Sequence, residues 1–203
     1  MNCTRFDFEA YRESLAQMHD HICPRQILGL RMGLYGAALL NFTVPQTGKH
    51  LLAFVETNGC FADGIAVATG CTLGHRTLYL MDYGKVAITL VDTQTGQAVR
   101  VAPHQESRRR ALEACPDTRS HWHAYLEAYQ ILDDEALLVA QPVTLNLALD
   151  RLISQPGRRV VCEGCGEEIL NEREVRVGDT LLCRACAGEA YYLPTHLRVP
   201  AEG

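Results

Sequence analysis

The chain has 203 residues, a formal net charge of −5, and 47% hydrophobic and 21% charged residues. This composition excludes a disordered chain, and the acidic balance argues against a nucleic-acid partner, because phosphate neutralisation dominates that kind of affinity. We find neither a secretory signal nor the roughly 18 consecutive apolar residues of a membrane span, so we expect a cytoplasmic protein with no membrane partner. Nine cysteines in a reducing compartment indicate metal or thiol chemistry rather than disulfides.

Two helices are predicted at the start of the chain. Apolar residues recur at three- and four-residue spacing over residues 7–18, which predicts the first helix. The second is predicted over residues 24–40, because Pro24 suits a first helical turn, where its missing N–H costs nothing. This helix carries three glycines between residues 29 and 36. They would destabilise it unless another part of the protein packs closely against them.

Strands and further helices follow in irregular order. The predicted strands are residues 51–56, 77–81, 86–91 and 98–101, the last two joined as a hairpin. Asp63 is expected to cap a short helix over residues 64–69, which Gly70 ends. Two more helices are predicted over residues 105–114 and 122–132. Because strands and helices do not alternate as regular βαβ units, the predicted fold class is an α+β core domain.

The composition changes after residues 156–159, where proline and glycine precede two arginines. We therefore predict a core domain of residues 1–155 and a small zinc-binding domain of residues 156–203. This second domain contains two Cys-x-x-Cys pairs separated by 17 residues. Their cysteines are Cys162, Cys165, Cys183 and Cys186.

Four thiolates at this spacing can close the coordination sphere of a structural Zn²⁺. Alternating residues around Gly178 predict a hairpin between the pairs, and Cys186 opens a short predicted helix. This order of elements is that of a treble-clef zinc finger, although a rubredoxin-like iron site or a redox pair would use the same cysteines. From residue 158 onward the chain has six basic and eight acidic residues. We therefore expect the finger to have a structural or protein-contact role rather than to bind nucleic acid.

A second cluster of metal-binding residue types lies in the core. His19, His21 and Cys23 alternate just before the second predicted helix, where a turn can bring two of them together and a helix start lowers the pKa of a thiol. Cys60 holds a similar place before the short helix. Cys71 at the far end of that helix, roughly 16 Å away at about 1.5 Å of rise per residue, is not expected on the same ion. The alternative is that these cysteines are small buried hydrophobic residues.

Three ordered motifs run through the same part of the chain. The first is His-Asp-His-Ile-Cys-Pro at residues 19–24 with Gly-Leu-Arg-Met-Gly at residues 29–33. The second is Gly-Cys-Phe-Ala-Asp-Gly-Ile at residues 59–65 with Thr-Gly-Cys-Thr-Leu-Gly at residues 69–74, and the third is Asp-Tyr-Gly-Lys at residues 82–85. Together they resemble the E-subunit family of formylmethanofuran dehydrogenase, over about residues 15–100, and some members of that family also carry an appended zinc finger.

This resemblance implies an α+β core, commonly dimeric, with a metal-binding cleft formed by the motif residues. The resemblance implies subunits of a molybdenum or tungsten enzyme as candidate partners, because the E subunit accompanies such an enzyme in methanogens, although many relatives have no such enzyme as an obvious partner. Arg25 stands where a glycine is usual in the family and His75 where a lysine is usual, so we expect altered charge near the cleft. Because the glycine-bearing second helix also offers close backbone approach, we predict a homodimer.

The favoured hypothesis is a metal-dependent enzyme or accessory subunit in one-carbon or molybdopterin redox metabolism. The expected ligands of a core metal of unknown identity are His19, His21 and Cys60. The side chains expected to handle protons or a ligand are Cys23, Asp63 and Lys85. The alternatives are a non-catalytic metal carrier or chaperone, and a dimeric interaction scaffold whose core cysteines only pack.

Two further groups of polar residues are interpreted as surface features. Arg108, Arg109 and Arg110 are expected to form a solvated helix face. His121 and His123 are expected at an exposed helix start. The less favoured alternatives are a binding patch at the arginines and a metal-ligand role for the two histidines.

Overall fold

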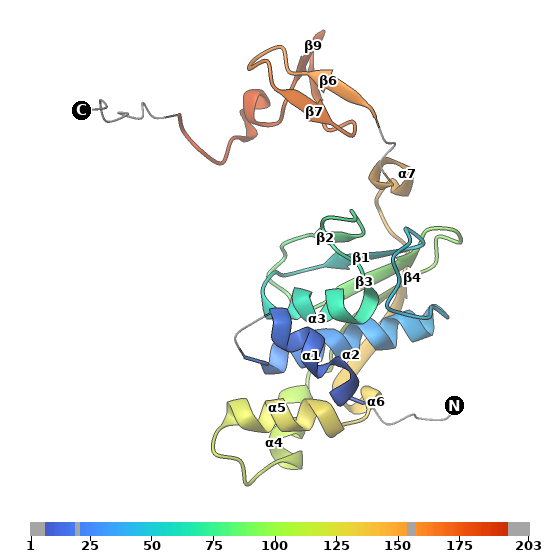
Figure 1. Cartoon of the computed structure of the whole chain (residues 1–203), viewed down its shortest axis with the longest axis vertical. Coiled ribbons are helices and arrows are strands. Elements are labelled where there is room, and N and C mark those ends of the chain that lie inside the picture. The colour runs from blue at the N-terminus through green and yellow to red at the C-terminus, as the bar shows by residue number, and fades with distance from the viewer. Residues whose placement is uncertain (1–6, 19–20, 154–156, 195–203) are drawn as a thin grey trace, which may run out of the picture. The chain divides into compact units, whose positions relative to one another are not determined.

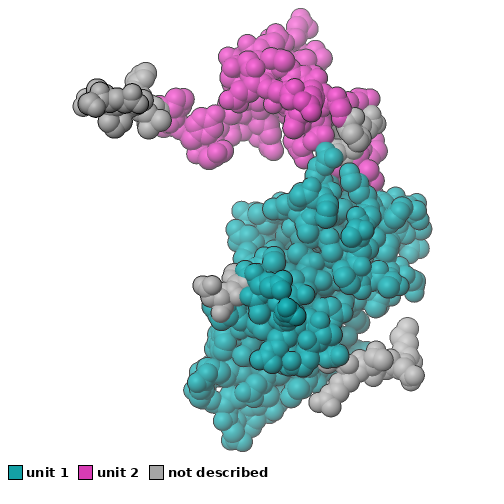
Figure 2. All heavy atoms as spheres, viewed as in Figure 1, with its two compact units in different colours: residues 1–147 teal, residues 148–203 magenta. Residues whose placement is uncertain are grey.

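The computed structural model describes residues 7–18, 21–153 and 157–194 of the chain. These residues form two compact units, residues 1–147 and residues 148–203 (Figure 2). The first unit ends before the domain boundary predicted at residue 155. Within the described ranges, no helix is both long and apolar enough to cross a membrane.

The first unit opens with two helices that a buried glutamine ties together. They are α1 (Glu9–Met18) and α2 (Pro24–Leu39), which confirms both predicted helices. Cys23 caps α2, and its thiol accepts the backbone N–H of Gln26. The Gln26 side chain accepts the N–H of Cys23 at 3.1 Å and donates to the carbonyl of Leu15 in α1, also at 3.1 Å. Because Gln26 is fully buried, these bonds fix the start of α2 against the end of α1.

A five-stranded sheet forms the centre of the first unit (Figure 1). Its strands are β1 (Leu51–Val55), β2 (Leu78–Leu80), β3 (Ile88–Asp92), β4 (Ala98–Pro103) and β5 (Leu138–Val143). Their order is β2-β1-β3-β4-β5, with β1 and β2 parallel and the other neighbours antiparallel. This mixed sheet confirms the predicted α+β class. Strand β5 was not predicted, and it carries Pro142, which an edge strand accommodates because one side of its backbone needs no partner.

Helix α3 (Cys60–Thr69) crosses α2 at very short range, and both lie along one face of the sheet (Figure 1). A Cβ atom placed on Gly29 would lie 2.2 Å from the carbonyl oxygen of Phe61, and one on Gly64 would lie 2.1 Å from that of Gln26. Only glycine permits such an approach of two backbones. The glycine face of α2 is therefore covered within the chain and gives no support to the homodimer, which stays a prediction.

The start of α3 also differs from the prediction. The helix begins at Cys60 after Gly59, whose φ of +85° suits glycine. Asp63 lies in the first turn rather than at the cap. The prediction that Gly70 ends this helix is confirmed, because Gly70 adopts the left-handed conformation there.

Three helices follow β4, and the second of them packs against the first half of α2. They are α4 (Ser107–Ala114), α5 (His121–Ile131) and the short α6 (Asp134–Leu137). Arg31 of α2 is almost fully buried and links these helices to α2. Its guanidinium donates hydrogen bonds of 2.7–3.1 Å to the carbonyls of Tyr129 and Leu132 and to the carboxylate of Asp134. A buried guanidinium with this many acceptors holds α5 and α6 in place against α2.

The second unit is built from short strands. They are β6 (Arg159–Val161), β7 (Glu168–Leu170), β8 (Val175–Val177) and β9 (Thr180–Leu182), after the short helix α7 (Leu149–Leu152). The β8–β9 pair confirms the predicted hairpin, and a helical turn at Ala185–Glu189 follows it as expected. The β6–β7 pair, which frames the first cysteine pair, was not predicted.

Candidate functional site

The four cysteines of the second unit form a compact group. Their sulfur atoms all lie within 4.8 Å of one another, and those of Cys165 and Cys183 are 4.0 Å apart. Zn–S bonds of about 2.3 Å in a tetrahedron place sulfur atoms about 3.8 Å apart. The arrangement therefore has the size of a closed four-sulfur zinc site.

The charges of the four finger cysteines also favour a bound cation. The N–H of Cys183 donates to the sulfur of Cys162 at 3.2 Å, and this bond is the main reason that the pKa of Cys162 falls to about 6. The three neighbouring sulfur atoms raise the pKa of Cys186 to about 12. Four thiolates so close together repel one another, so all four can be charged at neutral pH only around a positive ion.

A different pair of cysteines meets in the core. The glycine contacts between α2 and α3 bring the starts of the two helices together, and the thiols of Cys23 and Cys60 interact there. Burial, with a smaller effect of the Cys60 thiol, raises the pKa of Cys23, although the N–H of Gln26 opposes the shift. The expectation of a lowered pKa at Cys23 is therefore wrong, because desolvation outweighs the helix start.

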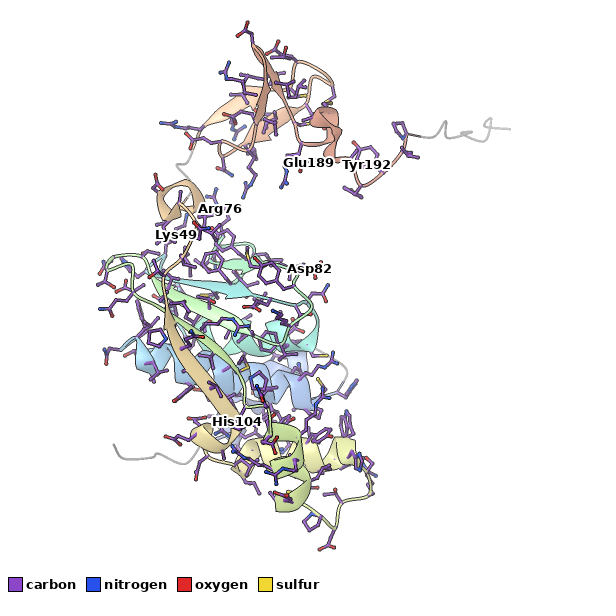
Figure 3. All side chains as sticks on the ribbon, turned by 180° about the vertical axis from the view of Figure 1, so that it is seen from behind. Lys49, Arg76, Asp82, His104, Glu189 and Tyr192 are labelled. Atoms are coloured by element: carbon purple, nitrogen blue, oxygen red, sulfur yellow. The ribbon has the colours of Figure 1, made fainter. Side chains whose placement is uncertain are left out.

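Both thiols open into a cavity of about 650 Å³ in the first unit, within the usual size range of small-molecule sites. Helices α4 and α5 supply much of the opposite wall. The polar and aromatic side chains that line the cavity include Arg25, His104, Arg108, Trp122, Tyr125 and Tyr129. His104 lies where β4 gives way to α4 (Figure 3). Its Nδ1 accepts the N–H of Glu106 at 3.0 Å, so its Nε2 is the nitrogen left for a ligand.

The other predicted core residues are placed differently. His21 is exposed, with its ring 6.4 Å from that of Trp122 at the cavity. Asp63 and Lys85 do not line the cavity, and His19 lies outside the described residues. Among the residues that the structure describes, only the finger cysteines form a group of three or more potential metal ligands.

The arginines and histidines that were predicted at the surface have different surroundings in the structure. Arg108 is exposed, as predicted for a solvated helix face, and it also lines the cavity. His123 contacts Ser120 through Nδ1 and Arg119 through Nε2, which leaves neither nitrogen for a metal. His104, Tyr125 and Tyr129 were not predicted at all. No local motif marks them, because packing of α4 and α5 against the start of α2 brings them to the cavity.

Comparison with known proteins identifies the core. A family described as "FmdE, Molybdenum formylmethanofuran dehydrogenase operon" matches residues 18–139. The chain belongs to this family. A second family, the prokaryotic dksA/traR C4-type zinc finger, matches residues 155–192. The FmdE core and the cysteine finger therefore agree with the predicted resemblance.

Two similar proteins place this FmdE-family chain among known ones. One is the crystal structure of an FmdE-like protein of the tungsten formylmethanofuran dehydrogenase type from Syntrophus aciditrophicus, with 25% identity, a TM-score of 0.59 and coverage of 95% of this chain and 98% of that one. The other is a probable S-adenosyl-L-methionine-binding protein of Archaeoglobus fulgidus, 40% identical over 97 residues. That match covers 46% of this chain, which spans only 26% of the length of that relative.

Proposed function

We propose that this FmdE-family protein binds a second metal ion in its core cavity, and acts as a metal-dependent enzyme or accessory subunit in one-carbon or molybdopterin redox metabolism. The observation that carries the proposal is the meeting of Cys23 and Cys60 in one cavity. The two cysteines come from separate segments, both within the family match.

The side chains around the cavity fit a soft metal ion. The thiols of Cys23 and Cys60 line the cavity, and the imidazole of His104 lines the same space. Thiolate and imidazole ligands select zinc, iron or copper rather than magnesium or calcium. Because both thiols line the same cavity, Cys23 is a better candidate for a second sulfur ligand beside Cys60 than for proton handling. His19 and His21 remain proposed ligands from the segment just before Cys23.

Such a metal would supply Lewis-acid chemistry, provided that it keeps an open coordination position facing the cavity. The protein's own contribution is a large, partly aromatic space beside the metal, with cationic groups on its wall. A metal carrier would also bind the metal, but it would not need a large cavity beside it. This favours an enzyme or accessory subunit over a carrier.

The proposal for binding partners rests on the family match and not on an observed contact surface. The Syntrophus aciditrophicus structure is described as a tungsten formylmethanofuran dehydrogenase FmdE-like protein. We therefore propose the subunits of a molybdenum or tungsten enzyme as partners of this chain. We also propose a homodimer, whose interface must lie away from the covered glycine face of α2.

Metal analysis of full-length variants tests the core site. We expect Cys60→Ser to contain one metal ion fewer per chain than the wild type, with a nearly unchanged melting temperature, because the large core does not depend on the ion. The matched control is Cys115→Ser, which changes a thiol outside the cavity and should keep the full metal content. Equal metal content in all three proteins would favour the scaffold hypothesis.

A further inference from the structure

The core cavity has an unusual charge for a protein of net charge −5. None of the residues that line it is an aspartate or a glutamate, whereas Arg25 and Arg108 both do. Neither guanidinium has a hydrogen-bond or ion-pair partner in the described part of the chain. Both arginines are exposed, and with no acidic side chain among the described lining residues they can attract an anion into the cavity.

The remaining arginines of the first unit make the contrast clear. Each one whose side chain the structure describes has an interaction partner, as in the pairs Arg31–Asp134 and Arg100–Glu56. Arg25 and Arg108 are therefore exceptions within this unit, and both line the same cavity.

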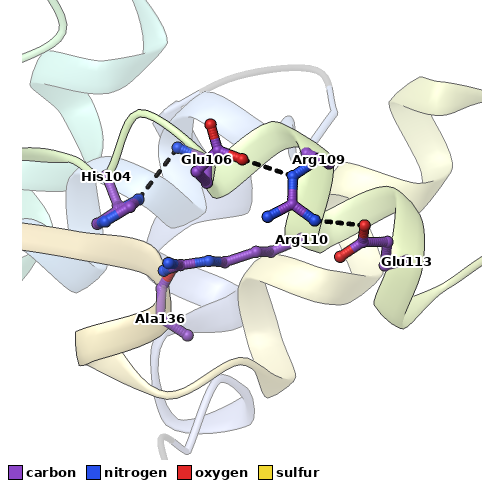
Figure 4. A network of polar contacts seen from close by, with 6 residues as sticks. All are labelled: His104, Glu106, Arg109, Arg110, Glu113 and Ala136. Atoms are coloured by element: carbon purple, nitrogen blue, oxygen red, sulfur yellow. Dashed lines mark hydrogen bonds and ion pairs between the residues drawn. The ribbon is translucent and has the colours of Figure 1, made fainter.

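Helix α4 shows the same contrast over three consecutive residues. Arg109 bridges Glu106 and Glu113, and Arg110 donates to the carbonyl of Ala136 (Figure 4). The preceding Arg108 lines the cavity instead. Arg108 and Arg109 are both exposed, but only Arg109 has ion-pair partners among the described residues, so the Arg108 guanidinium is available to a ligand in the cavity.

Aromatic side chains form another part of the cavity wall. Tyr125 and Tyr129 stack with their ring centroids 5.8 Å apart and their planes 12° from parallel, and Trp122 lies on the same wall. Aromatic walls favour flat ligands, because rings stack on or pack edge-to-face against other rings. A cavity of about 650 Å³ has room for such a molecule.

We propose that this cavity binds a small organic anion that has a flat conjugated ring and a carboxylate or phosphate group. Arg25 and Arg108 hold the anionic group, and the aromatic wall holds the ring. The inference rests on the proposed function in naming the ligand class of the same cavity, but the anion is held by arginines and not by the metal. The two ideas can therefore fail separately.

Binding of four simple probes to the full-length protein tests the inference. They are 2-naphthoate, 2-naphthyl phosphate, the neutral 2-naphthamide and the ring-saturated cyclohexanecarboxylate. Because Trp122 is the single tryptophan of the chain, quenching of tryptophan fluorescence reports on this cavity, and equilibrium dialysis gives the affinity. We expect one of the two naphthyl anions to bind at least about tenfold more tightly than the amide and the saturated acid. Whichever naphthyl anion binds better identifies the carboxylate or the phosphate as the group recognised.

Variants then assign the binding to the two arginines. Arg25→Gln and Arg108→Gln should each weaken binding of the better anion about tenfold. Arg109→Gln, one residue further along α4, should bind as the wild type does. Equal binding of the naphthyl anions and the amide, or equal binding by Arg108→Gln and Arg109→Gln, would overturn the inference.

The Cys60→Ser protein separates this inference from the proposed function. If it has lost the core metal and still binds the anion, both ideas stand. Anion binding in a wild type that holds only the finger metal would remove the proposed core metal and leave the anion site. A wild type that holds the core metal but does not distinguish charged from neutral probes would remove the anion site alone.

Discussion

At the scale of single residues, the core cysteines differ in what surrounds them. Cys23 and Cys60 meet in the cavity, whereas Cys71 is buried at the other end of α3, with its sulfur 3.5 Å from the carbonyl of Leu51. The expectation that Cys71 does not share an ion with Cys60 agrees with this placement. For Cys71, the interpretation as a small buried hydrophobic residue fits the structure.

The stability of the protein at high pH should report on this buried thiol. Burial raises the pKa of Cys71 above its ordinary value of 9.0. Above that value the unfolded chain has lost the proton while the folded chain keeps it, so the free energy of unfolding falls as pH rises; below it the contribution is fully present. Cys71→Ala should therefore lose stability less steeply with pH, by up to about 1.4 kcal/mol per pH unit.

Urea unfolding of both proteins under reducing conditions measures this difference. The pH should run from about 8 to about 10.5, the range in which an ordinary thiol titrates. Other groups with raised pKa values, such as Tyr129, contribute equally to both proteins and cancel. Parallel stability curves would mean that Cys71 loses its proton equally easily in the folded and unfolded chains.

The two departures from the family pattern, Arg25 and His75, lie in different surroundings. Arg25 lines the cavity, so this change does place a positive charge at the proposed site. His75 is exposed in a turn, where its Nδ1 lies 3.1 Å from the Thr72 hydroxyl, and it does not line the cavity. Of these two residues, Arg25 therefore lines the proposed cleft and His75 does not.

At the scale of elements, the pairing of α2 with α3 places the site. Glycines at the crossing allow the backbones to approach, and this approach brings the helix-start residues Cys23 and Cys60 together. The placement of the two cysteine-bearing motifs therefore depends on glycines that carry no chemistry themselves. A change at the crossing should damage both the fold and the site.

Gly64→Ala tests this dependence. The added Cβ would lie 2.1 Å from the carbonyl oxygen of Gln26 and 2.8 Å from the N–H nitrogen of Leu30, both backbone atoms that cannot turn away. We expect a loss of at least about 2–3 kcal/mol in the free energy of unfolding, with loss of the core metal. The control is Gly74→Ala, where a Cβ meets nothing within 4 Å and stability should change by less than about 0.5 kcal/mol.

Much at this scale could be predicted from the sequence, because the signals are local. The apolar spacing of α1, the proline that opens α2 and the turn between β3 and β4 each lie within a few residues of the element that they define. The start of α3 was misplaced because a glycine cap leaves no side-chain signal. The motifs pointed to Cys23 and Cys60, but not to the wall opposite, which comes from α4 and α5 through contacts distant in sequence.

At the scale of the whole molecule, the two units hold themselves together by different means. The first has a large apolar cluster between the sheet and the helices. In the described part of the second, only Cys162 and Ile169 are buried hydrophobic residues. Its ion pairs, such as Arg159–Glu168, are exposed and contribute little. A unit with so small a core depends on its metal to fold.

Loss of one finger ligand should therefore unfold the second unit and spare the first. We expect Cys183→Ser to lose the finger zinc, so that limited proteolysis cleaves within residues 158–194, while residues 7–147 persist and their melting temperature changes by less than about 2 °C. Cys60→Ser should behave in the opposite way, keeping the finger protected while losing the core metal. The melting temperature, the protease pattern and the metal content are measured on the same full-length samples. If Cys183→Ser instead lowered the melting temperature of the core along with that of the finger, the two units would stabilise each other, and the finger would be part of the FmdE domain's own folding unit rather than an independent metal-dependent appendage.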